Sequence, residues 1–116
     1  MQWKRIAVRF YRTERGSEPV REWLRSLNKT DRVLIGTDVR KVEYGWPIGM
    51  PTCRAMGQWL YEVRTTLPGN RIARLLFCVA NSEMTLLHGF MKKSQKTPKS
   101  DLAVAIDRKR RMETEQ

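Results

Sequence analysis

Charged side chains interrupt segments of this sequence that otherwise have the pattern of buried β-strands. Glu62 and Arg64 share one face of a predicted strand, and Arg74 lies in the middle of the next, strongly apolar one. His88 and Lys92 share a face at the end of a third strand. Because strands joined by short connections pair as antiparallel hairpins, these positions can converge on one open face. Guanidinium and ammonium groups there would neutralise phosphates, so the pattern predicts a groove that binds RNA.

Ordinary structural roles compete with this functional interpretation. Glu62 and Arg64 could form a solvated strand face, and Arg74 could be a structural ion-pair partner of Glu62. His88 could be a hydrogen-bonded histidine in or near the core. Phe90, which shares the face of His88, could stack on a splayed base or belong to the core. The residue pattern by itself leaves these alternatives open.

Apolar periodicity predicts the elements that must position these side chains. It indicates a single domain over residues 1–116, in the order strand, helix, helix, three strands, helix. The predicted ranges are 3–11, 17–27, 30–45, 58–66, 71–80, 84–91 and a last helix capped at Ser100–Asp101. The side chains expected to face inward from the first strand and the last helix are Ile6, Val8, Phe10, Leu102, Ala105 and Ile106. We therefore expect an α+β fold in which helices pack on one face of an antiparallel sheet with a three-strand meander.

Local signals predict where the first two helices begin and end. Ser17 is the expected N-cap of the first helix, and Thr30–Asp31 form the expected cap and acidic first turn of the second. Gly45 is the expected stop of the second helix. Gly36 weakens the middle of that helix by about 1 kcal/mol relative to alanine. We expect this glycine to let another element approach closely.

The chain is strongly basic. Its 116 residues include 23 Lys or Arg and 12 Asp or Glu, which gives a formal net charge of +11. This excess predicts a polyanionic partner, for which nucleic acid is the best fit, or an acidic protein that masks the charge. No apolar run is long enough to span a bilayer, and the N-terminus lacks the apolar stretch of a signal peptide. We therefore expect a soluble, cytoplasmic protein with no membrane partner.

The two cysteines add no predicted site. Cys53 and Cys78 have no further cysteine or histidine at metal-ligand spacing, so a zinc site is not expected. A structural disulfide is disfavoured in the cytoplasm. We expect Cys78 to be a small core residue and Cys53 to have no special role.

Three segments form a signature that spans the predicted meander and the connection after it. They are residues 60–64 (LYEVR), 71–77 (RIARLLF) and 86–98 (LLHGFMKKSQKTP). The last segment is long and rather specific. Together the segments resemble the HigB-type toxins of the RelE/ParE superfamily of type II toxin–antitoxin systems, in the subgroup of phage-derived Gp49-like proteins. The resemblance covers most of the chain.

The resemblance implies a compact RelE-like fold, in agreement with the predicted elements. It also implies an endoribonuclease that cuts messenger RNA in the ribosomal A site and so stops translation. A cognate antitoxin, usually a helix-turn-helix protein, would neutralise it, and the toxin–antitoxin pair would bind its own operator DNA. Such cleavage needs no metal or other cofactor, because the ribose 2′-OH attacks the adjacent phosphorus and leaves a 2′,3′-cyclic phosphate and a free 5′-OH.

The resemblance also assigns roles to the residues on the predicted open face. Arg64 and Arg74 match arginines on the family's central strands, which implies that they clamp the scissile phosphate. Lys92 and Lys93 match its lysine pair, one of which would assist transition-state stabilisation or proton transfer. Lys92 is favoured, because strand phase places it on the face of His88.

Further roles are assigned to the neighbours of these cations. His88 and Glu62 are candidate acid or base groups. Phe90 and Lys96 are candidate substrate contacts, the first by stacking and the second by its charge.

Two other functions fit part of the pattern. The first is a ParE-like inhibitor of DNA gyrase without nuclease activity, although a pure protein binder has no need of a phosphate clamp. The second is a non-enzymatic basic RNA-binding module, which would share the net charge and the groove. New 5′ ends on messenger RNA would separate the nuclease from this module.

Overall fold

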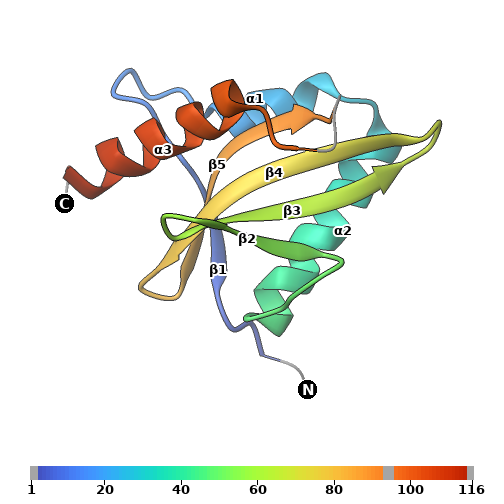
Figure 1. The fold of residues 1–116 in the computed structure, drawn as a ribbon, viewed down its shortest axis with the longest axis horizontal. Coiled ribbons are helices and arrows are strands. Elements are labelled where there is room, and N and C mark those ends of the chain that lie inside the picture. The colour runs from blue at the N-terminus through green and yellow to red at the C-terminus, as the bar shows by residue number, and fades with distance from the viewer. Residues whose placement is uncertain (1–2, 93–95, 115–116) are drawn as a thin grey trace.

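The protein, described here by a computed structural model that covers residues 3–92 and 96–114, combines three helices with a five-stranded sheet (Figure 1). In chain order the elements are β1 (Ala7–Phe10), α1 (Pro19–Ser26), α2 (Lys29–Gly45), β2 (Cys53–Gly57), β3 (Leu60–Leu67), β4 (Arg71–Ala80), β5 (Glu83–Met91) and α3 (Lys99–Thr114). The predicted α+β class is confirmed. Within the described ranges, no helix is both long enough and apolar enough to cross a membrane.

The sheet is mixed, with the strand order β1-β5-β4-β3-β2. The meander formed by β3, β4 and β5 is antiparallel, as predicted. The expectation of a purely antiparallel sheet is wrong, because β1 pairs in parallel with β5, and β2 adds an unpredicted strand beside β3. Neither pairing has a local sequence signal: β1 meets a strand from far along the chain, and β2 has only five residues.

Helices cover both faces of the sheet, with α1 and α2 on one side and α3 on the other (Figure 1). The core on the α1–α2 side includes Val20, Ile35, Val42, Val63, Leu75, Phe77 and Leu86. The core on the α3 side includes Tyr11, Leu60, Leu76, Cys78, Leu87, Phe90 and Ala105. The prediction that all helices lie on one face is therefore wrong. Successive residues of β4 are buried on alternate faces, and a strand that is apolar on both faces needs cover on both.

The side chains predicted to face inward near the two ends of the chain do pack against the cores. Those of the first strand region join the α1–α2 core, and those of the last helix join the α3 core. They are Ile6, Val8, Phe10, Leu102, Ala105 and Ile106. The alternation and helical spacing that predicted them are local properties of the sequence. The prediction of these side chains is therefore correct although the predicted sheet topology is not.

α2 begins two residues earlier than predicted. The side chain of Asn28 accepts a hydrogen bond from the backbone N–H of Asp31 at 2.8 Å, so Asn28 is the N-cap in place of Thr30. The carboxylate of Asp31 instead pairs with both Nη atoms of Arg71 at the start of β4, at 2.7 and 3.0 Å. The hydrogen bond from Arg71 holds the pKa of Asp31 below its usual range. This pair fixes the start of α2 to the sheet, and Gly45 is the last residue of the helix rather than the residue after it.

The expected cap of α1 is also wrong. The N-cap is Glu18, which makes no capping hydrogen bond through its side chain. The hydroxyl of Ser17 lies 2.8 Å from the hydroxyl of Thr13, and the Ser17 N–H donates to Thr13 Oγ1 at 3.1 Å. The loop therefore uses Ser17 internally. Pro19 at the first helical position has no N–H, so it leaves one fewer donor to be capped.

Gly89 allows α1 to approach β5 closely. A Cβ atom at this position would lie 2.3 Å from Cε3 of Trp23, closer than two carbon atoms can pack. Gly36 was expected to permit a close approach, but a Cβ atom there would meet nothing within 4 Å. The close contact thus involves α1 rather than α2. The glycine that it requires lies in the segment 86–98 singled out by the sequence signature.

These two glycines give opposite expectations for alanine substitution. Gly89→Ala should lower the free energy of unfolding by about 1–3 kcal/mol, because the methyl group overlaps the Trp23 ring. Gly36→Ala should raise it by roughly 0.5–1 kcal/mol, because alanine is the better helix former in open space. Urea unfolding of both variants and the parent measures the difference. Equal stability of the two variants would contradict the close packing of α1 on β5.

Candidate functional site

A buried ion pair lies in the middle of the sheet face that α3 covers. Arg74 Nη1 lies 3.1 Å from Glu62 Oε1, and the side chains are 1% and 0% exposed. The strand register places Arg64 opposite Arg74 and Phe90 opposite Arg74 on its other side. Directly opposed residues share a face, so these predicted residues do come together. The interpretation of Arg74 as the structural ion-pair partner of Glu62 is confirmed.

Thr97 forms hydrogen bonds with both residues of the buried ion pair. Its hydroxyl donates to Glu62 Oε2 at 2.7 Å and accepts from Arg74 Nη1 at 2.9 Å. Thr97 lies just before α3, so this contact ties the connection after β5 to the centre of the sheet. Sequence reasoning assigned no role to Thr97. Its place in the segment 86–98 was the signal that could have singled it out.

Three cations border this pair and form what we call the cationic cluster: Arg54, Arg64 and Lys92. Arg54 on β2 lies directly opposite Glu62 and is exposed, whereas Arg64 and Lys92 are half-buried. The backbone N–H of Lys92 donates to the carbonyl of Ile72 at 2.7 Å, so the pairing with β4 continues one residue beyond β5. Arg54 was missed because β2 itself was not predicted.

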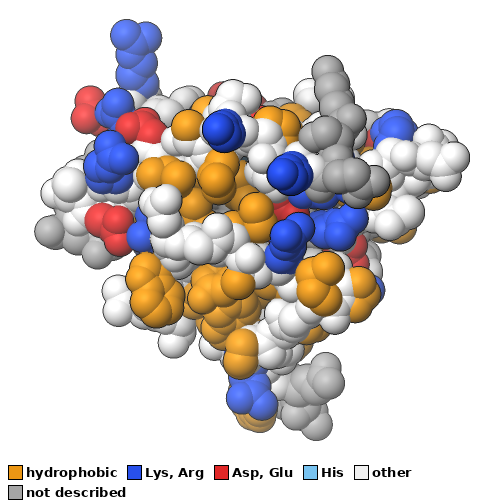
Figure 2. Space-filling model, in the orientation of Figure 1, with side chains coloured by type: hydrophobic (Ala, Val, Ile, Leu, Met, Phe, Trp, Pro, Cys, Tyr) orange, Lys and Arg blue, Asp and Glu red, His pale blue; other side chains and the backbone are white. Residues whose placement is uncertain are grey.

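The pKa of Lys92 reports the electrostatics of the cationic cluster. Partial burial lowers this pKa, and the positive charges of Arg74, Arg64 and Arg54 lower it further, against an opposing effect of Glu62. The carboxylate thus offsets the neighbouring guanidinium groups only in part. Figure 2 shows Lys and Arg side chains gathered over the part of the sheet where β2, β3 and β4 lie. A face of this kind attracts an anion with several negative oxygens, such as a phosphodiester.

His88 and Phe90 lie beside the buried pair but make contacts with the protein itself. His88 Nε2 is 2.7 Å from Asp101 Oδ1 in the first turn of α3, and its ring stacks on that of Phe90 with centroids 5.6 Å apart. Phe90 is 9% exposed and belongs to the core on the α3 side. The structural interpretations of both residues are therefore confirmed. The expected role of Phe90 as a base-stacking platform does not fit a ring that is buried in this way.

Two predicted lysines lie in the connection between β5 and α3. Lys93 is outside the residues that the structure describes. Lys96 is exposed and directly precedes Thr97, so the contact of Thr97 with the buried pair also holds the backbone of Lys96 near this face.

Neither cysteine is a candidate for a chemical role at this site. Both are buried, and burial is the main cause that raises the pKa of each thiol to about 11. A thiol with so high a pKa is a poor nucleophile near neutral pH. Across residues 3–92 and 96–114, no group of three or more His, Cys, Asp or Glu side chains is arranged to hold a metal ion.

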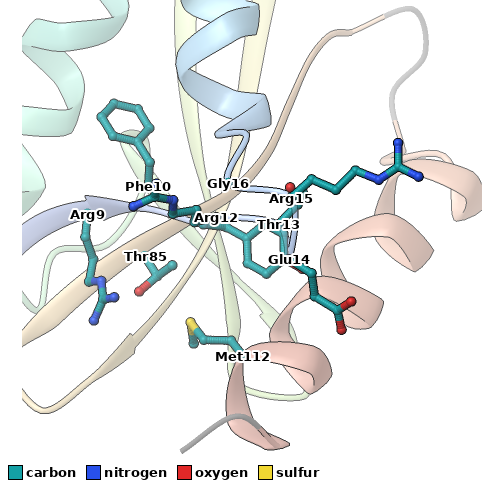
Figure 3. A pocket seen from close by; sticks show the side chains of 10 residues that line it. Arg9, Phe10, Arg12, Thr13, Glu14, Arg15, Gly16, Thr85 and Met112 are labelled. Carbon is teal, nitrogen blue, oxygen red and sulfur yellow. The ribbon is translucent and has the colours of Figure 1, made fainter.

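A cavity of about 710 Å³ lies elsewhere, between the end of β1 and the last turns of α3. Its labelled side chains come from β1, the loop after it, β5 and α3, among them Arg9, Arg12, Thr85 and Met112 (Figure 3). No residue of the cationic cluster lines it. Arg64 lines a different cavity, of about 440 Å³, together with residues of α2 such as Asp38 and Lys41. The candidate site is therefore a charged face with one cavity beside Arg64.

The chain matches the sequence model of a known protein family. The sequence model of the family described as phage-derived protein Gp49-like (DUF891) matches residues 22–110. The matched region runs from α1 into α3 and includes the buried pair, Thr97 and the cationic cluster. No curated protein matches the chain.

The buried ion pair leads to a prediction about the free energy of unfolding. Glu62→Leu should lower the free energy of unfolding by about 3–5 kcal/mol, because it leaves the charge of Arg74 buried without its carboxylate. The double variant Glu62→Leu/Arg74→Met should recover most of that loss, since it removes both charges and keeps the volume apolar. Urea unfolding monitored by tryptophan fluorescence compares the variants. A double variant as unstable as the single one would show that the loss does not come from an uncompensated charge.

Proposed function

The chain belongs to the family of phage-derived Gp49-like proteins, within the RelE/HigB-like toxin superfamily, and we propose that it cleaves messenger RNA on the ribosome. Membership of this family indicates a toxin of a toxin–antitoxin system, and the α+β architecture with its mixed sheet is compatible with a RelE-like fold. The observation that carries the nuclease proposal is the cationic cluster, which lies beside the buried ion pair of Arg74 and Glu62.

The cluster supplies what cleavage by the ribose 2′-OH requires. The 2′-oxygen gives its proton to a base, for which His88 is the candidate, and bonds to phosphorus. The bond to the 5′-oxygen breaks and that oxygen takes up a proton, which leaves a cyclic phosphate and a 5′-hydroxyl. Arg64 and Arg54 bind the non-bridging oxygens and stabilise the charge that develops on them. Lys92, as an ammonium group, adds charge near the leaving oxygen and can supply its proton. Every step uses side chains of this protein and the RNA itself.

The buried residues have supporting roles in this proposal. Arg74 is 1% exposed, so it does not reach substrate in this conformation. Glu62 is equally buried and serves to hold Arg74 and Thr97 rather than to transfer protons. His88 is the remaining candidate for proton transfer, because its side chain is 19% exposed at the border of the face. Lys96 is exposed and adds positive charge for the RNA. Lys93, which follows Lys92 in the sequence, is kept as the second lysine of the proposed pair.

The proposal includes the partners that the superfamily uses. A cognate antitoxin, usually a helix-turn-helix protein, masks the basic surface, and the complex of the two binds operator DNA. The free toxin acts in the cytoplasm on the ribosome, where a net charge of +11 favours docking on ribosomal RNA. A ParE-like gyrase inhibitor would not need three cations around one face. A non-enzymatic RNA-binding module would use them, and the experiment below distinguishes it.

Removal of Arg64 tests the proposed reaction. Arg64→Ala should reduce the rate of messenger RNA cleavage by about 100-fold or more, because one preorganised donor to the phosphate is lost. Cleavage is measured by mapping new 5′ ends after induction, with and without active ribosomes. Arg40→Ala removes an equal charge from the exposed surface of α2 and should cleave as the parent does. If the parent itself produces no new ends while ribosomes are active, the protein is a binding module and not a nuclease.

The lowered pKa of Lys92 gives a pH prediction. The ammonium form is required, so cleavage should fall as the pH rises through this pKa, which lies below the usual value of 10.5. Lys92→Arg keeps its charge at these pH values and should extend cleavage to higher pH, even if its rate at neutral pH is lower. Rates over a pH series with a fixed substrate compare the two proteins. Parallel alkaline falls in parent and variant would assign the loss to another group.

A further inference from the structure

The turn between β2 and β3 holds a bulky side chain in a backbone conformation that favours glycine. Gly57, Gln58 and Trp59 have φ values of 84°, 54° and 61°. Tight hairpin turns of this kind normally use asparagine, aspartate or glycine, because a side chain clashes with its own backbone at positive φ. The other two hairpin turns place smaller residues at positive φ, with Gly69 and Asn70 at one and Asn81 and Ser82 at the other. Trp59 does not follow this preference.

Packing does not compensate for this strain. Trp59 is 77% exposed, whereas the next residue, Leu60, is 1% exposed in the core on the α3 side. The buried leucine holds the turn in place, and the indole projects from it into solvent. Strain that is retained without a gain in burial indicates that the side chain is used for something other than folding.

The charges on the hairpin indicate what the indole meets. Between Cys53 and Leu67 the charged residues are Arg54, Glu62 and Arg64, and Glu62 is fully buried. The hairpin therefore presents only positive charge to solvent. Trp59 precedes Arg64 by five residues of an extended strand, about 17 Å. An RNA strand with phosphates on Arg54 and Arg64 could place an unpaired base, a few nucleotides away, against the indole.

We propose that Trp59 is a stacking platform for an unpaired RNA base, outside the cationic cluster but on the same strand of RNA. The identity of the ligand as RNA rests on the proposed function. Aromatic side chains bind single-stranded bases in this way with little sequence preference, because every base has a flat face. The role assigned from the sequence to the buried Phe90 thus passes to an exposed ring on the neighbouring hairpin.

The experiment measures binding and stability together. The probe is a fluorescently labelled 2′-O-methyl oligoadenylate of about twelve nucleotides, which cannot be cleaved at its 2′ positions. Trp59→Gly should raise Tm by roughly 4 °C or more, because glycine relieves the strained backbone. The same variant should bind the probe about 5- to 100-fold more weakly, because the stacking surface is lost. Trp59→Phe keeps an aromatic ring and should stay within a few-fold of the parent.

Matched controls separate stacking from other causes. Trp3→Ala removes another exposed indole, 76% exposed, and should leave the affinity unchanged. The salt dependence of binding should be the same for Trp59→Gly and the parent, whereas Arg54→Ala should make it shallower because a phosphate contact is lost.

Several outcomes would overturn the inference. Parental affinity of Trp59→Gly for the probe would do so, as would an equal loss in Trp3→Ala. Loss of antitoxin binding with RNA affinity intact would assign the indole to a protein partner instead. Because the probe is uncleavable, this result does not depend on nuclease activity. A protein that binds RNA through Trp59 but cuts no message would retain this inference and lose the proposed function.

Discussion

The ion pair between Arg74 and Glu62 is the constraint on which the rest of the structure depends. Two charges in the interior are tolerated only when each is paired and hydrogen-bonded. They come from neighbouring strands, so the register of β3 against β4 must be correct before they meet. Thr97 completes the pair from a third segment, which fixes the residues just before α3 to the sheet. The strand register and the position of these residues are therefore set together.

Two arginines on this sheet face differ in how far solvent can reach them. Arg64 and Arg74 lie opposite each other on the neighbouring strands β3 and β4. Arg74 is buried beside a carboxylate, whereas Arg64 is half-buried. What differs is their surroundings: Arg74 hydrogen-bonds to Thr97 and lies opposite Phe90, whereas Arg64 lines a cavity. The buried guanidinium still acts at a distance, because its charge helps to lower the pKa of Lys92. A buried charge can thus adjust the pKa of a lysine on the accessible part of the face.

The turn at Trp59 also combines a backbone conformation that is unfavourable for a bulky residue with an exposed side chain. Most of the net charge of +11 is spread over the surface, where it favours any polyanion. Selectivity needs features that are local and shaped. A hairpin that carries the exposed Arg54, the half-buried Arg64 and an exposed indole is such a feature, and Leu60 anchors it in the core.

Properties that depend on neighbours in the chain could be predicted from the sequence. Strand alternation placed Glu62, Arg64 and Arg74 on one face, and helical spacing identified the buried side of α3, because side-chain direction repeats with a fixed local period. The signature in residues 60–64, 71–77 and 86–98 led to the family. The N-cap of α2 lies two residues before the predicted Thr30, because the side chain of Asn28 caps the helix instead.

Burial and pairing were decided only by the tertiary structure. The parallel pairing of β1 with β5, the additional strand β2 and the position of α3 on the opposite face all join segments that are distant in the chain. These contacts buried Arg74 and Phe90, left Arg64 and Lys92 accessible, and brought Arg54 to the same face. The sequence determined which side chains face the same way. Only the packing of remote elements decided which of them water, and therefore a substrate, can reach.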